Sequence, residues 1–171
     1  NILWTIWRWW YRIPKNGNAF ADIDVQLKQR HDLIPQLVAT VKGYAAHEEG
    51  VLTAVTKARQ KAVMANTVND KIAAEVALTS AVSGFNMQME AYPDLKANQN
   101  FMQLQEEMSD IENKLAAVRR YFNSTTREMN NAVQKFPNNI LAGMFGFKEQ
   151  PYFDLGSTQR EVLDKAPEIN F

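Results

Sequence analysis

Apolar residues follow a single helical stripe through the early part of the chain. They recur at alternating steps of four and three residues, at Ile23, Leu27, Ile34, Leu37, Val41, Tyr44, Val51, Val55, Ala58 and Ala62. This spacing puts side chains on one face of an α-helix that packs along another helix. The pattern predicts one long helix over about residues 19–65. We expect a kink at Pro35, which lacks the N–H that would bond to the His31 carbonyl.

Two positions of this stripe carry charged side chains, Arg30 and Glu48. Polar residues at such positions cost stability, but they can fix helix register or the choice of partner. Two interpretations stay open at this point. The side chains pair with charges on a neighbouring helix, or they reach solvent at the edge of the bundle. Both residues are therefore candidates for a protein interface.

The same alternation predicts two further long helices and a short one. The second helix covers about residues 68–91 and ends at Pro93, and the third covers about residues 99–136 and ends at Pro137. A short apolar helix follows near residues 139–147. The expected fold class is all-α, an up-and-down bundle of three long antiparallel helices plus a shorter fourth helix.

Residues 1–18 differ from the rest of the chain. They begin with an aromatic run, and we expect Pro14 and Gly17 to break the helix after it. The run is too short and too charged to span a bilayer alone, but aromatic rings beside Arg8 and Arg12 suit the membrane–water interface. We interpret it as the end of a membrane anchor or an interfacial segment, and the alternative is a cap of rings on the bundle. The candidate membrane-interface residues are Trp4, Trp7, Trp9, Trp10 and Tyr11.

Composition argues against several kinds of function. The 171 residues suit one domain, and 19 basic and 19 acidic residues give a net charge of zero. A neutral chain gives no support for sequence-independent binding of nucleic acid. With no cysteine, the chain has no disulfide, thiol nucleophile or zinc–thiolate site. Asn123-Ser124-Thr125 matches a glycosylation acceptor, but it falls inside a predicted helix and we take it as a chance match.

Residues that could carry chemistry are few. His31 and His47 lie roughly 24 Å apart along a straight helix, and within one chain they cannot share a metal ion unless the helix breaks sharply. The chain has neither a nucleophile elbow nor a phosphate-binding loop. We expect no catalytic residues, no cofactor-binding site, no metal site and no enzymatic activity. A hydrolase remains an alternative, and it would require carboxylates such as Glu48, Glu75 and Glu106 to converge between helices.

The C-terminal part of the chain carries a second concentration of apolar residues. Met144, Phe145 and Phe147 are its candidates for a protein interface. In one interpretation these side chains fold back over the end of the bundle. In the other they form a docking surface for a membrane or for a second copy of the chain.

Several long motifs occur in order along the chain. They are the runs Ala21–Pro35, Thr40–Ala45 and Tyr92–Phe101, the segment Phe136–Phe147, and the ending Ala166–Phe171. Together they closely resemble the signature of the LemA family of bacterial membrane-anchored proteins. The resemblance covers residues 19–171. It divides the chain into an anchor remnant or interfacial segment at residues 1–18 and a LemA-like helical bundle at residues 19–171.

The resemblance implies a single transmembrane helix and a bundle on the cytoplasmic side of the bacterial inner membrane, without an agreed biochemical activity. One relative is associated with magnetosome membranes, which suggests membrane organisation by analogy. We expect a non-enzymatic scaffold or adaptor that contacts membrane lipid at its N-terminus and forms a homo-oligomer or binds another membrane protein. An alternative is a module that binds a partner helix in an open groove between the first and third helices.

Overall fold

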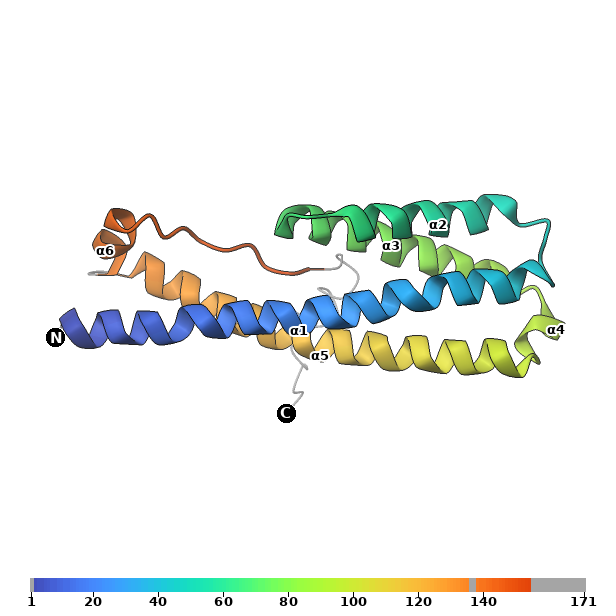
Figure 1. The fold of residues 1–171 in the computed structure, drawn as a ribbon, viewed down its shortest axis with the longest axis horizontal. Helices are drawn as coiled ribbons and strands as arrows, with labels where there is room; N and C mark the ends of the chain where they lie inside the picture. Colours follow the sequence, from blue (N-terminus) through green and yellow to red (C-terminus); the bar gives the residue numbers. More distant parts are fainter. Residues whose placement is uncertain (1, 136–137, 155–171) are drawn as a thin grey trace, which may run out of the picture.

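The computed structural model describes residues 2–135 and 138–154, with side chains from Gly17 onward except those of residues 138 and 141. Within these ranges the chain is helical and has no strand, so the all-α class is confirmed. Figure 1 shows long helices lying side by side, with α1 packed mainly along α5 and α2 mainly along α3. The helices are α1 (Ile2–Lys42), α2 (Glu49–Met64), α3 (Val68–Met89), α4 (Pro93–Lys96), α5 (Gln99–Gln134) and α6 (Asn138–Met144).

The prediction of one helix over residues 19–65 is wrong, because the chain turns at residues 43–48 and folds into α1 and α2. Backbone N–H groups of Ala45 and Glu48 close this turn on the carbonyls of Val41 and Ala45, at 2.9 and 3.1 Å. The side chain of Ala45 is fully buried. The turn keeps the four-and-three spacing in phase, so the stripe continues from one helix to the next. The bundle therefore has four long helices, where the sequence pattern predicts three.

The predicted break at residues 14–17 is also wrong, because α1 runs without interruption from Ile2 to Lys42. A proline inside a helix removes one backbone hydrogen bond, but its fixed φ angle is itself helical. The residues after Pro14 still carry N–H groups that can bond to the preceding turn. The aromatic N-terminal segment and the bundle therefore share a single helix.

The long helices α3 and α5 each begin at a side-chain cap. The side chain of Thr67 accepts a hydrogen bond from the backbone N–H of Asp70 at 3.1 Å, and α3 begins directly after Thr67, at Val68. Asn98 accepts one from the N–H of Phe101 at 3.0 Å at the start of α5. Such caps satisfy backbone donors that the first helical turn leaves unpaired. The predicted helices over residues 68–91 and 99–136 are confirmed within two residues at each end.

Buried apolar side chains form two clusters along the bundle. The larger cluster joins α1, α2, α3, α4 and α5, and its members include Ile34, Val41, Val55, Leu78, Phe85, Leu95 and Ile111. The smaller cluster lies nearer the N-terminal end of α1 and contains Ala19, Ile23, Leu27, Leu115, Phe122 and Phe153. Figure 1 shows that the α2–α3 pair covers only the part of α1 distant from its N-terminus. In the other part, the segment after α6 covers the α1–α5 pair and adds Phe153 to the core.

Two asparagines of α5 hold this segment in place. Asn123 donates to the carbonyl of Phe153 at 3.0 Å and accepts from its N–H at 2.8 Å. Asn130 makes the same reciprocal pair with the backbone of Gln150, at 3.0 and 2.9 Å. Residues seven positions apart lie two turns along one face of a helix. The side chains thus pin an extended stretch of backbone along α5.

Candidate functional site

The most concentrated polar chemistry in the described chain surrounds Arg30 in the middle of the bundle. Its side chain is 1% exposed. Its Nη1 atom lies 3.1 Å from a carboxylate oxygen of Glu75, and its Nη2 donates to the hydroxyl of Thr79 at 3.0 Å, both on α3. Its Nε atom lies 2.9 Å from Glu112 on α5, as an ion pair without hydrogen-bond geometry. One guanidinium from α1 therefore connects three helices.

The second oxygen of Glu75 contacts Nε2 of His31, the neighbour of Arg30 on α1. In the tautomer that carries its proton on Nε2, the imidazole donates a hydrogen bond to this oxygen. The backbone carbonyl of His31 accepts a bond of 2.6 Å from Nε of Arg59 on α2. This contact brings α2, the one long helix not yet named, to the cluster. Pairing of this kind compensates the cost of removing Glu75, which is 1% exposed, from water.

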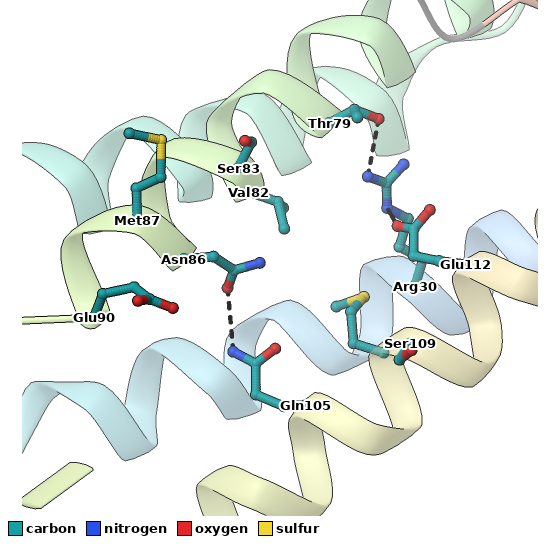
Figure 2. A pocket seen from close by; sticks show the side chains of 11 residues that line it. Arg30, Thr79, Val82, Ser83, Asn86, Met87, Glu90, Gln105, Ser109 and Glu112 are labelled. Atoms are coloured by element: carbon teal, nitrogen blue, oxygen red, sulfur yellow. Dashed lines mark hydrogen bonds and ion pairs between the residues drawn. The ribbon is translucent and has the colours of Figure 1, made fainter. Parts of the chain in front are cut away.

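An open groove runs beside this cluster between α3 and α5, and Figure 2 shows it from close by. Its volume is about 470 Å³. Arg30, Thr79 and Glu112 lie at one end, and Asn86 and Gln105 face one another across the middle with a hydrogen bond of 3.1 Å. The remaining lining side chains are Val82, Ser83, Met87, Glu90, Met108 and Ser109. The groove has charged side chains at both ends, with apolar side chains and neutral amides between them.

A second hollow, of about 450 Å³, lies on the other side of Glu75 between α1, α2 and α3. His31 and Glu75 line it together with Lys71, which forms an ion pair with Asp24 at 2.9 Å. Charged side chains of both signs surround this hollow. Among residues 2–135 and 138–154, no three His, Asp or Glu side chains come together in a way that could hold a metal ion.

Of the predicted interface residues, Arg30 and Glu48 both have partners within the chain. Arg30 is buried and pairs with charges on neighbouring helices, which is one of the two interpretations open from sequence. Glu48 is half-buried at the start of α2 and accepts a hydrogen bond of 2.8 Å from the hydroxyl of Tyr92. This bond is the main reason why the pKa of the Tyr92 hydroxyl is raised. Burial and the negative charge of Glu48 raise it further. Arg30 is closed to a partner in this state of the bundle.

The other predicted interface residues lie at the opposite end of the molecule. Met144 and Phe145 are exposed, and Phe147 is half-buried. The candidate membrane residues Trp4, Trp7, Trp9, Trp10 and Tyr11 lie on the first turns of α1, and their side chains fall outside the described part of the structure. Across the described residues, no helix holds a stretch both long and apolar enough to cross a membrane.

The carboxylates named for a hydrolase do not converge. Glu48 binds Tyr92 at the turn, Glu75 is buried against Arg30, and Glu106 is exposed on α5. His47 is exposed in the turn between α1 and α2. The two carboxylates that do approach a common point are Glu75 and Glu112, and an arginine lies between them.

Sequence reasoning missed Glu75 as the central acid of the cluster, although the pattern contains a signal for it. Glu75, Leu78, Val82, Phe85 and Met89 continue the four-and-three spacing along α3. All five are buried or half-buried. A glutamate at the start of such a stripe points into the core and needs a cation, and Arg30 is the cation on the facing stripe.

Comparisons with known proteins agree with the motifs in the sequence. Residues 19–171 match the sequence profile of the LemA family. The chain is 26% identical to Protein LemA of Metamycoplasma hominis over 152 residues, which covers 87% of this chain and 68% of that protein. It is 24% identical over 159 aligned residues to Magnetosome protein MamQ of Magnetospirillum gryphiswaldense, covering 78% of this chain and 58% of the relative. The chain thus spans about three fifths to two thirds of the length of these relatives.

Proposed function

The chain belongs to the LemA family, and from that premise we propose a membrane-anchored, non-enzymatic scaffold or adaptor. In this proposal residues 1–18 contribute to a single-pass anchor in the bacterial inner membrane, and the bundle lies on the cytoplasmic side. The bundle contacts further copies of itself or another membrane protein. The relative named as a magnetosome protein supports, by analogy, a role in organising membrane.

The observation that carries this proposal is the continuity of α1. The aromatic residues from Trp4 to Tyr11 and the buried Arg30 stand on one helix of 41 residues, roughly 60 Å long. A continuous helix transmits the orientation of its anchored end to the bundle, whereas a flexible linker would let the bundle rotate freely. A scaffold needs such a fixed geometry relative to the membrane.

The polar cluster supports a structural role over a catalytic one. Glu75 has both carboxylate oxygens occupied, by Arg30 and by His31. General acid–base catalysis needs a titrating group within reach of a substrate. Here the strongest candidates neutralise one another inside the core. Buried charge networks of this kind can specify how helices are paired, which suits a bundle that must present constant surfaces.

The groove between α3 and α5 favours a second candidate, an adaptor that binds one helix of a partner protein. Val82, Met87 and Met108 offer apolar contacts, while Asn86 and Gln105 offer neutral hydrogen-bonding groups. Helices bind in grooves through apolar residues on one face. The groove predicted between the first and third helices is not the one found, since α1 packs directly along α5.

Deletion of residues 1–13 tests the anchor. We expect the full chain to float with membranes in a density gradient and the deleted chain to stay in the soluble fraction. A second variant replaces Trp4, Trp7, Trp9 and Trp10 with Gln, which keeps the length of the segment and removes its interfacial chemistry. We expect this variant to lose membrane binding as well. Flotation of both variants with the full chain would contradict the proposal.

A further inference from the structure

The short helix α6 presents a surface that no described part of the chain covers. Ile140, Met144 and Phe145 are all more than half exposed, and Met144 reaches 76%. Ile140 and Met144 are four residues apart and so lie on one face of the helix. Large apolar side chains grouped in this way on a small element mark a contact surface.

The turn after α6 directs the side chains of Phe145 and Phe147 to different sides. Gly146 has a φ angle of +70°, a left-handed conformation that glycine adopts at little cost. Its N–H bonds to the carbonyl of Gly143 at 3.4 Å, and the N–H of Phe147 bonds to the carbonyl of Ala142 at 2.9 Å. These two bonds form a Schellman motif, which ends the helix. Phe147 thereby returns toward the bundle, while Phe145 stays outside.

This surface lies at the same end of the molecule as the aromatic start of α1. Figure 1 shows α6 at the end of the bundle where α1 begins, and α6 contacts α5 there. Gly17 and Phe20 of α1 line a hollow of about 350 Å³ together with Phe147, just after α6. Two apolar segments far apart in the sequence therefore lie at the same end of the bundle.

The charge of both segments matches an anionic bilayer. Residues 1–18 contain three basic residues and no acidic residue, and residues 135–148 contain Lys135 and Lys148, with Glu149 directly after them. Apolar side chains enter the boundary between headgroups and acyl chains, while basic residues bind anionic headgroups. A protein partner would not require basic residues on both segments.

We infer that α6 is a second membrane contact, in which Ile140, Met144 and Phe145 enter the surface of an anionic bilayer beside the N-terminal segment of α1. The inference rests on the proposed function, because it takes residues 1–18 as the first contact. The continuous helix holds the bundle rigidly relative to its anchor, but the anchor and the bundle can still turn together about the axis of α1. A second contact fixes the rotation and determines which face of the bundle meets a partner.

Two residues of equal exposure allow a matched test in the full chain. Met64 at the end of α2 is exposed to 76%, the same fraction as Met144. Because the chain has no cysteine, Met144→Cys and Met64→Cys can each carry one environment-sensitive fluorophore. On vesicles of phosphatidylcholine and phosphatidylglycerol, we expect a blue shift and quenching by brominated lipid for the label at 144 only. We expect Met144→Glu to lower the partition constant roughly tenfold, and Met64→Glu to leave it unchanged.

The outcomes separate the two proposals. If the full chain does not sediment with vesicles, the anchor and the scaffold proposal fail together with this inference. If it sediments and the label at 144 remains in water, the second contact is wrong and the anchor stands. Shielding of the label at 144 without vesicles, together with excimer formation between pyrene labels, would assign the surface to a second copy and overturn the inference.

Discussion

Arg59 on α2 donates a hydrogen bond of 2.6 Å from Nε to the backbone carbonyl of His31 on α1. In a regular helix this carbonyl would accept a bond from the N–H of residue 35, but Pro35 has no N–H. The missing N–H of Pro35 leaves the His31 carbonyl free to accept a bond at the point where α2 passes α1. A backbone bond lost within one helix is thus replaced by a contact between two helices.

This relationship predicts coupling between Arg59 and Pro35. Arg59→Ala removes the donor and should lower the free energy of unfolding by about 1–2 kcal/mol. Pro35→Ala restores an N–H that can bond to His31, so Arg59→Ala should cost less in that background. We expect a coupling free energy of at least about 0.5 kcal/mol in a double-mutant cycle from urea denaturation. Strictly additive effects would show that the carbonyl gains nothing from Arg59.

The buried ion pairs predict that the two carboxylate partners of Arg30, Glu75 and Glu112, contribute unequally to the free energy of unfolding. Arg30→Met leaves Glu75 in the core without its guanidinium and should lower the free energy of unfolding by about 3–5 kcal/mol. Adding Glu75→Gln should recover much of this loss, because the charge that lacks a partner is then gone.

Glu112→Gln is the matched control, since it removes another carboxylate from the same arginine. The Glu112 side chain is 38% exposed, so its pairing is partly screened and the substitution should cost about 1 kcal/mol or less. Urea denaturation of the three variants and the unchanged protein measures these differences. Equal losses for Arg30→Met and Glu112→Gln would refute the central place given to Glu75.

The sequence predicted the parts of the fold where one local signal decides the outcome. The starts of α3 and α5 agree with the prediction because Thr67 and Asn98 cap them, and their last residues lie within two positions of the predicted ones. The turn at residues 43–48 was missed because it preserves the phase of the apolar stripe, and only tertiary packing of α2 on α3 reveals it. The break expected at Pro14 was wrong because a proline costs a helix one hydrogen bond, which a continuing helix can tolerate.

Only part of the site could be predicted from the sequence. The charged positions Arg30 and Glu48 are visible as interruptions of a stripe, but their partners lie 45 and 44 residues further along the chain, respectively. Such pairings depend on how helices are arranged. Asn123 was dismissed as a chance match to a glycosylation acceptor, whereas its side chain holds the backbone of Phe153. Side-chain bonds to an irregular segment leave no periodic pattern in a sequence.

Asn130 is predicted to hold the segment after α6 in place. Its side chain is buried and makes both of its observed bonds to the backbone of Gln150. Asn130→Ala leaves those backbone groups without partners and should cost about 1–3 kcal/mol. Amide hydrogen exchange at Gln150 and Phe153 should become faster. Asn131→Ala, at the exposed neighbouring position, should leave the exchange unchanged, and similar exchange in both variants would count against this role.

The contact between Tyr92 and Glu48 predicts a loss of stability in alkali. The folded state raises the pKa of Tyr92, chiefly through its hydrogen bond to Glu48. The stabilisation is therefore fully present below the pKa of an unfolded tyrosine, near 10, and is lost as pH rises through the folded value. Glu48→Gln should bring the Tyr92 pKa back toward its ordinary value. Carbon-13 chemical shifts of labelled tyrosine rings measure this, and an unchanged pKa would argue against the contact.

The central claim is that the protein is a scaffold or adaptor, and the mass of the particle extracted from native membranes in mild detergent tests it most directly. Native mass spectrometry of that particle gives the number of chains and any other protein bound to them. We expect either a defined number of copies of this chain or a complex with another membrane protein. A particle that contains one chain, with lipid and detergent alone, would contradict the scaffold.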